Sequence, residues 1–241
     1  MTHFTRRALL IGAGIALPGL MVAGCATTAM SGDMTEALRR LLTISSERAL
    51  TRLVSDTGFL NDPAARLTLP GVEGDRSGAV LGALLRSAPV QRELTLAINR
   101  IAADAADRAA PMILDSIRSL TFSDALGIVR GGPTAATGYL QQAIGDRILD
   151  AMLPEVGRGF RQFDSQSVLG PVIRAATGIS VSAIQRTITT QVAQTIWRAI
   201  GNEEAAIRND PARAGDRLVA AMLTSGRLMG ASQAQRIADS G

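Results

Sequence analysis

Residues 182–208 decide the fold that we expect, and they read SAIQRTITTQVAQTIWRAIGNEEAAIR. Apolar, β-branched side chains recur every four residues along this stretch, at Ile184, Ile188, Val192, Ile196 and Ile200. A spacing of three to four residues places side chains on one face of an α-helix. The stretch therefore predicts one long amphipathic helix with a buried aliphatic stripe.

The same spacing recurs in both directions along the chain. We predict long helices over Met34–Val54, Val90–Ala110 and Thr134–Met152, and shorter ones over Leu81–Arg86, Val168–Ala176, Gly215–Leu223 and Gly226–Ala238. Only Arg66–Leu69 alternates in the manner of a short extended piece. The pattern contains no strand-rich block and no repeat, so it predicts an all-α fold, an irregular multi-helix bundle in a single domain.

Prolines and capping residues mark the expected helix ends. Pro111 predicts a kink or a new helix start, because proline lacks the amide proton of a helix interior. Pro154 predicts the start of another short helix, since proline suits the first helical turn. Thr121, followed three residues later by Asp124, resembles a capping box for a short helix over Ser123–Val129.

The first 25 residues are typical of a bacterial lipoprotein signal. Arg6 and Arg7 supply positive charge, an apolar run extends from Ala8 to Gly24, and Cys25 follows small residues. The run is too short and too glycine-rich for a comfortable membrane span, which needs about 20 apolar residues. Cys25 is the only cysteine, and its thiol would carry the lipid. An ordinary signal peptide with a chance cysteine is the less favoured alternative.

These features divide the chain into a signal peptide (1–24), a short lipidated tether (25–34), a helical domain (35–225) and a C-terminal extension (226–241). We expect the protein to face the periplasm. Ala26 after Cys25 favours the outer membrane, by resemblance to enterobacterial sorting rules. Arg6 and Arg7 also resemble a twin-arginine export signal, and the general secretory route is an equal alternative.

Composition excludes several chemistries. Every basic residue is arginine, and the only histidine is His3. The chain after Cys25 therefore lacks the Ser-His-Asp triad, the Cys-His pair, the Schiff-base lysine and the His or Cys zinc site. We expect no cofactor and no metal, and an enzyme is less favoured than a binding protein.

Charge argues against nucleic-acid binding. Because Arg6 and Arg7 precede Cys25, the remaining chain carries 23 arginines and 21 acidic residues, a net charge of +2. The charges alternate rather than forming a basic stripe, and aromatic residues make up only 3% of the chain. Nucleic-acid binding favours a basic stripe and aromatic platforms.

Several short motifs resemble a known family when they are taken in order. They are Gly58–Pro63, Leu67–Pro70, Asn99-Arg100, Thr121–Ala125, Ala135–Tyr139 and Glu203–Arg213. Their order and spacing resemble bacterial domain-of-unknown-function family four-one-nine-seven over roughly Thr35 to Leu223. The resemblance implies an envelope protein, often a lipoprotein, and it implies no activity.

Candidate binding residues follow from polarity and from loop position. They are Gly58, Phe59, Asn61, Asn99, Arg100 and Tyr139. Asn is a poor helix former, so Asn99 either contacts a ligand or makes a buried hydrogen bond. Tyr139 and Trp197 are the sole residues of their types, and each could line a pocket or pack in the core with its polar tip satisfied.

Acidic residues supply the alternative function. Asp104, Asp107 and Asp115 share helix surface, and Asp104–Arg108 and Glu204–Arg208 have the spacing of helical ion pairs. We expect solvated, salt-bridged faces here. Two carboxylates facing each other across a cleft would instead support a hydrolase acting on envelope polymers. The favoured interpretation is a membrane-anchored, non-enzymatic protein that binds an apolar ligand or an envelope protein.

Overall fold

The computed structural model describes residues 23–55, 57–61, 67, 87–166 and 180–226, with side chains from Asp33 onward except that of Asn61. Every regular element among these residues is a helix, which confirms the all-α prediction. The elements are α1 (Ala23–Val54), α2 (Gly58–Asn61), α4 (Ala88–Ser119), α5 (Ala125–Arg130), α6 (Ala135–Ile144), α7 (Arg147–Gln166), α9 (Val181–Asn209) and the 3₁₀ turn η2 (Pro211–Ala214). Residues 217–226 form a further helical segment.

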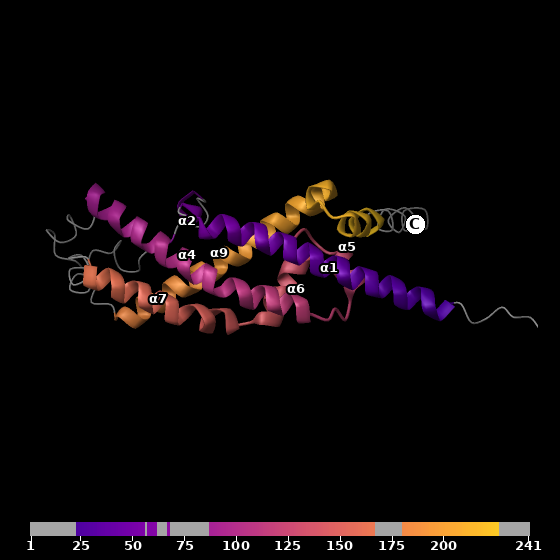
Figure 1. Ribbon diagram of the computed structural model, residues 1–241, viewed down its shortest axis with the longest axis horizontal. Coiled ribbons are helices and arrows are strands. Elements are labelled where there is room, and N and C mark those ends of the chain that lie inside the picture. Colours follow the sequence, from indigo (N-terminus) through magenta and orange to yellow (C-terminus); the bar gives the residue numbers. More distant parts are fainter. Residues whose placement is uncertain (1–22, 56, 62–66, 68–86, 167–179, 227–241) are drawn as a thin grey trace, which may run out of the picture.

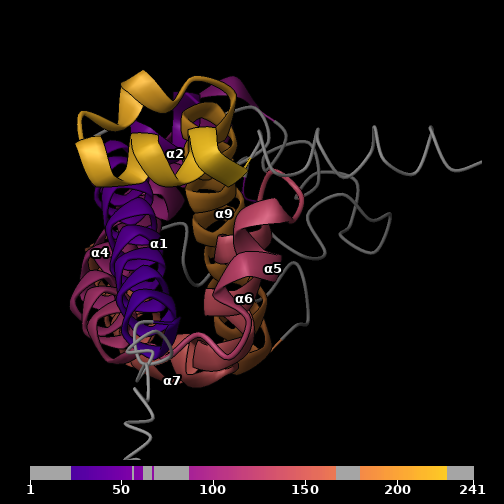
Figure 2. The ribbon, with the colours of Figure 1, turned by 90° about the vertical axis from the view of Figure 1, so that its right-hand side faces the viewer.

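Four long helices build an elongated body (Figure 1). Helix α4 packs along α7, and α1 packs against both α4 and α9. Seen end-on, α1 and α4 lie on one side of the body and α9 lies on the other, with α5 and α6 beside it (Figure 2). Helix α6 contacts α9, α4 and α1, and α5 contacts α1 and α6.

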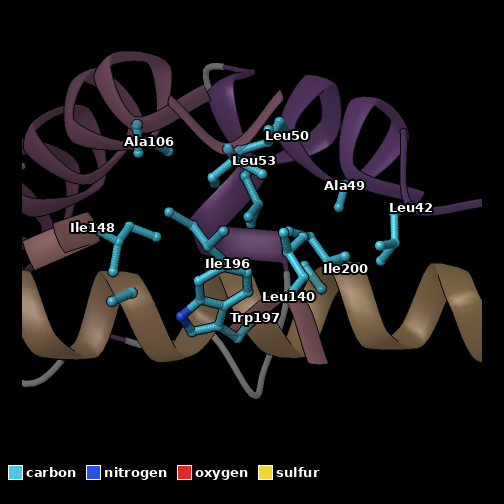
Figure 3. Close-up of a cluster of buried hydrophobic side chains, with 14 of the residues drawn as sticks. Leu42, Ala49, Leu50, Leu53, Ala106, Leu140, Ile148, Ile196, Trp197 and Ile200 are labelled. Atoms are coloured by element: carbon cyan, nitrogen blue, oxygen red, sulfur yellow. The ribbon is translucent and has the colours of Figure 1, made fainter. Parts of the chain in front are cut away.

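Helix α9 forms as its aliphatic stripe predicts. Ile188, Val192, Ile196 and Ile200 are fully buried, and Trp197 is 7% exposed. Ser180 begins the helix, and its hydroxyl accepts a hydrogen bond from the amide of Ala183, as a helix cap does. Figure 3 shows the α9 side chains packed against leucines of α1 and Leu140 of α6. The core is thus aliphatic, as the scarcity of aromatic residues requires.

Helix α4 does not restart at Pro111. It runs unbroken from Ala88 to Ser119 with Pro111 inside it. Buried residues continue on both sides of the proline, since Ala109 and Ile113 are fully buried. Packing of that continuous apolar face outweighs the loss of one backbone hydrogen bond.

The helix expected over Thr134–Met152 is two helices. Helix α6 ends at Ile144 because Gly145 adopts a φ of 57°, a conformation that glycine tolerates and other residues rarely do. Helix α7 then begins at Arg147 and runs through Pro154, so the expectation that Pro154 opens a helix is wrong. Asp124 itself caps α5, accepting from the amide of Gly127 at 2.7 Å, in place of the Thr121–Asp124 capping box.

Helix α1 begins at Ala23, earlier than the expected Met34. The backbone of the segment expected as a tether, including Cys25, therefore belongs to this helix. The expected pieces Leu81–Arg86, Val168–Ala176 and Gly226–Ala238 and the extended piece Arg66–Leu69 lie wholly or mostly outside the described residues.

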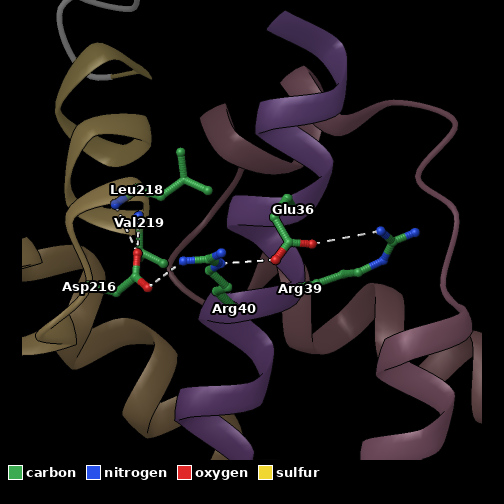
Figure 4. A network of polar contacts seen from close by, with 6 residues as sticks. All are labelled: Glu36, Arg39, Arg40, Asp216, Leu218 and Val219. Carbon is green, nitrogen blue, oxygen red and sulfur yellow. Dashed lines mark hydrogen bonds and ion pairs between the residues drawn. The ribbon is translucent and has the colours of Figure 1, made fainter. Parts of the chain in front are cut away.

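A polar network joins α1 to the segment 217–226 (Figure 4). Arg40 contacts Glu36 at 2.9 Å and Asp216 at 3.1 Å. Asp216 accepts hydrogen bonds from the amides of Leu218 and Val219. The amide of Val219, together with Arg40, lowers the pKa of Asp216. Asp216 is thus a helix cap and an ion-pair partner at once.

Candidate functional site

The residues expected to form a binding site do not come together. Tyr139 donates a hydrogen bond from its hydroxyl to the carbonyl oxygen of Thr121 at 2.7 Å, just beyond the end of α4. Asn99 lies 20 residues before Ser119 in the same helix, which places it about 30 Å away along the axis at 1.5 Å per residue. The two side chains therefore cannot contact one small ligand.

Each of these residues has a structural environment of its own. The ring of Tyr139 packs 5.2 Å from that of Phe122, centroid to centroid. Asn99 is 5% exposed within α4. Arg100 beside it is exposed. The polar tip of Tyr139 is satisfied, which agrees with a packing role.

Gly58, Phe59 and Asn61, the candidates chosen for a loop position, belong to the short helix α2. Gly58 and Phe59 hold this helix against the body. Phe59 is 2% exposed and belongs to the hydrophobic core. A β-carbon on Gly58 would lie only 2.3 Å from the carbonyl oxygens of Arg52 and Leu53, so only glycine fits there. Gly58 and Phe59 thus act in packing. The side chain of Asn61 and that of Cys25 lie outside the described residues.

A groove lies between α6, α7 and α9. It measures about 540 Å³ and opens to solvent. Its lining consists of Gly138, Gln141, Gln142, Gly145, Asp146, Ile148, Leu149, Thr190, Ala193, Gln194 and Trp197. We call it the Trp197 groove.

The Trp197 groove combines an apolar floor with an amide rim. Ile148, Leu149 and Trp197 supply apolar surface, and three glutamines supply donors and acceptors. Asp146 is the one charged residue of the lining. A few polar groups around an apolar floor are typical of sites for small amphipathic ligands.

Glycines keep the Trp197 groove open. A β-carbon added at Gly138 would meet nothing within 4 Å, so a side chain there would enter empty space. Gly145 turns the chain between α6 and α7 at the edge of the same groove. The expectation for Trp197 is either that it lines a pocket or that it packs in the core. The structure confirms each of these in part, since the residue is mostly buried and also lines the groove.

A second groove of about 590 Å³ lies between α4 and α7. Its lining consists of Arg108, Pro111, Met112, Asp115, Ser116, Ser119, Arg147, Asp150, Ala151, Pro154, Glu155 and Arg158. We call it the arginine groove. Charges of both signs line it, in contrast to the Trp197 groove.

Two of the three acids in the arginine groove are engaged on their own helices. Asp115 pairs with Arg118, and Glu155 pairs with Arg158 at 3.0 Å. Asp150 makes no ion pair with any described residue. The groove therefore holds carboxylates from two helices, but most of them are already bound by arginine.

The other acidic candidates lie on the outer surface. Asp104 and Asp107 are exposed and line neither groove. The ion pair expected between Asp104 and Arg108 does not form among the described residues, and Arg108 lines the arginine groove instead. No group of His, Cys, Asp and Glu among the described residues has the arrangement of a metal site.

The pair Glu204–Arg208 forms as expected but is buried, so the expectation of a solvated face is wrong there. The Nε atom of Arg208 lies 2.7 Å from the carboxylate of Glu204, and the two side chains are 9% and 0% exposed. Glu204 also accepts from the amides of Ala136 and Thr137, at 3.0 and 2.7 Å, and from the Thr137 hydroxyl at 2.6 Å. These amides belong to the first turn of α6, where a negative charge is favoured.

Arg208 completes this polar centre from the other side. Its guanidinium donates to the carbonyl oxygens of Val129 and Ile128, at 2.8 and 3.0 Å, in the last turn of α5. A cation is favoured at a helix C-terminus. One buried ion pair on α9 therefore fixes the end of α5 and the start of α6. The i,i+4 spacing was the available signal for the pair, and nothing in the spacing indicated burial.

Comparison with known proteins gives one match. The protein family described as "Protein of unknown function (DUF4197)" matches residues 28–223. No curated protein and no solved structure matches the chain. Among the described residues, no helix is long and apolar enough to cross a membrane.

Proposed function

This chain belongs to the DUF4197 family of proteins of unknown function, and we propose that it is a lipid-anchored binding protein of the bacterial cell envelope. In this proposal Cys25 carries the lipid on the periplasmic side, at the outer membrane, and the helical body binds an amphipathic ligand. The observation that carries the binding part is the Trp197 groove.

The N-terminal residues support the anchor. Charge at Arg6 and Arg7, the apolar run to Gly24 and the single cysteine form the pattern of a lipoprotein signal. Cys25 lies in the first turn of α1, and Ala37 is the first buried core residue of that helix among the side chains that the structure describes. Ala37 is twelve positions after Cys25, or about 18 Å along the axis at 1.5 Å per residue.

That distance would hold the body away from the lipid surface. Figure 1 shows the N-terminal end of α1 extending beyond α5 and α6. More than one lipid chain is needed for stable anchoring, and a triacylated cysteine meets that need. The anchored protein would thus present its grooves to the periplasm rather than to the lipid.

The groove supports ligand binding over catalysis. The Trp197 groove contains one carboxylate, that of Asp146, and offers no second acid to share proton transfer. The arginine groove has the carboxylates that a hydrolase would need, but Asp115 and Glu155 are ion-paired with arginines of their own helices. The carboxylate-based hydrolase acting on envelope polymers is therefore the second candidate.

Trp197 gives a direct assay for the groove because it is the only tryptophan. We would titrate the protein with a dibrominated fatty acid, whose bromine atoms quench indole emission at short range. We expect saturable quenching in the wild-type protein. The Gly138→Leu variant places a bulky side chain in the lining of the groove without a clash at its β-carbon, since the space around Gly138 is open, and it should weaken binding at least tenfold.

Gly138→Ala is the matched control. It adds one methyl group at the same position and should bind as the wild type does. Circular dichroism would establish that both variants are folded. Quenching that does not saturate, or equal quenching in the Gly138→Leu variant, would remove the groove from the proposal.

A further inference from the structure

The arginine groove carries an inference that is independent of the Trp197 groove. We propose that it binds a phosphate group between Arg108 of α4 and Arg147 of α7, with Asp150 receiving a hydrogen-bond donor on the same ligand. The ligand class is a phosphate ester that carries an ammonium or hydroxyl group a few bonds from the phosphorus.

The two arginines face one groove from opposite helices. Arg108 and Arg147 both line it, and both are exposed. Neither makes an ion pair or a hydrogen bond with a described residue. Guanidinium groups bind phosphate oxygens through paired donors, which is why arginine is favoured at such sites.

The packing of the helices sets the separation of these arginines. Helix α7 returns along α4 in the opposite direction (Figure 1). A β-carbon on Gly159 would lie 2.6 Å from Cγ1 of Ile101, so these two residues are neighbours across the pair. Counting back along α7 from this contact places Arg147 level with about residue 113, or about 8 Å along the axis from Arg108. Two arginine side chains can converge over that distance.

The remaining charges favour an anion next to a donor. Asp115 and Glu155 are neutralised by Arg118 and Arg158. Helix α7 begins at Arg147, so the positive end of its dipole lies at the groove. Asp150 lies one turn further along and makes no ion pair with a described residue. It would repel a bare anion and attract an ammonium or hydroxyl group attached to one.

A phosphate ester of this class can be a soluble molecule or the headgroup of a lipid, and the experiment separates these two sources. The full chain in detergent would be titrated with O-phosphoethanolamine by calorimetry at low salt. It would also be mixed with vesicles of phosphatidylethanolamine and with vesicles of phosphatidylcholine. Because the apolar N-terminal residues would themselves bind vesicles, each variant is scored by its preference for the first lipid over the second.

We expect Arg108→Gln and Arg147→Gln each to weaken binding at least fivefold. Arg100→Gln is the matched control, because Arg100 is exposed on α4 and lies outside both grooves. It should change binding less than twofold. Asp150→Asn should weaken phosphoethanolamine and strengthen inorganic phosphate, which a general loss of charge would not do.

The outcomes are distinct. If the protein binds the soluble ester, and this binding is weaker in Arg108→Gln and Arg147→Gln, the site takes a soluble ligand. A vesicle preference that falls in the same variants, without binding of the soluble ester, supports the site with a lipid headgroup. Equal losses in Arg100→Gln and the groove variants, or no binding in either arm, would overturn the proposal and would leave the Trp197 groove untouched.

Discussion

Replacing Glu204 with alanine should destabilise the fold more than any surface change on the same helix. The substitution removes the acceptor of the Ala136 and Thr137 amides, of the Thr137 hydroxyl and of Arg208. It leaves Arg208, whose side chain is 9% exposed, as a buried charge without its carboxylate.

The size of the effect follows from that burial. Removing one partner of a buried ion pair costs about 3–5 kcal/mol, because the other charge stays out of water without compensation. For a chain of this length each kcal/mol lowers Tm by about 2–4 °C, so we expect a loss of roughly 6–20 °C. The substitution also leaves the amides at the start of α6 without an acceptor, and the cost of these unsatisfied donors is already included in this range.

Glu203 supplies the control on the neighbouring residue. It pairs with Arg52, and the Arg52 and Glu203 side chains are 52% and 13% exposed, so the pair is open to solvent on the arginine side. Exposed ion pairs contribute about 0–1 kcal/mol, so Glu203→Ala should change stability by less than about 1 kcal/mol. Urea unfolding followed by Trp197 emission and by circular dichroism would measure both variants.

A double-mutant cycle completes the test. Glu204→Ala and Arg208→Ala should cost much less together than the sum of the single variants, since each one leaves the other partner unpaired. If Glu204→Ala costs no more than Glu203→Ala, or if the two changes are additive, the buried pair does not fix α5 and α6 as described.

Three further predictions concern the ends of helices. Gly145→Ala should destabilise the fold by about 1–2 kcal/mol because the φ of 57° at this position is strained for an L side chain. Gly138→Ala, inside α6, should stabilise the fold by about 0.5–1 kcal/mol. Thermal melts should therefore show a lower Tm for the first variant and a higher Tm for the second. Asp124→Ala should cost about 1 kcal/mol through loss of the cap on the Gly127 amide, with Asp104→Ala, exposed in mid-helix, as the unaffected control in urea unfolding. The Val219 amide is the main cause that lowers the pKa of Asp216 from its ordinary value of 3.8. The ionised carboxylate therefore contributes to folding stability above pH 3.8, and this contribution is lost as the pH falls through the folded-state pKa. Between pH 7 and pH 3 the wild-type protein should lose more stability than Asp216→Asn, and equal losses would contradict the assigned cap.

The long helices could be predicted from the sequence because their stripes are continuous. The four-residue spacing from Ile184 to Ile200 is sustained over enough turns to exclude a strand, and α9 spans the expected residues. The break between α6 and α7 could not be predicted in the same way. Gly138 and Gly145 are the same residue type in one apolar pattern, yet Gly145 ends a helix and Gly138 lies inside one. Tertiary packing decides between them.

The candidate sites were harder to predict, for a related reason. Asn99 and Tyr139 are unusual residues for their positions, but the structure places Asn99 about 30 Å along the axis of α4 from the Thr121 carbonyl that Tyr139 contacts. Arg108 and Arg147 are ordinary surface residues in the sequence, and only the antiparallel packing of α4 and α7 brings them to one groove. Likewise, the burial of Glu204 depends on two helix ends that are distant in the chain.

The mass of the N-terminal peptide tests the central claim most directly. The protein would be isolated from bacterial membranes, digested and measured by mass spectrometry, with Cys25→Ser as the control. Lipid anchoring predicts a first residue of Cys25 whose mass includes diacylglycerol and an amide-linked fatty acid, and a Cys25→Ser protein that lacks the modification and leaves the membrane fraction. A wild-type protein that retains residues 1–24, or that carries an unmodified Cys25, would contradict the account.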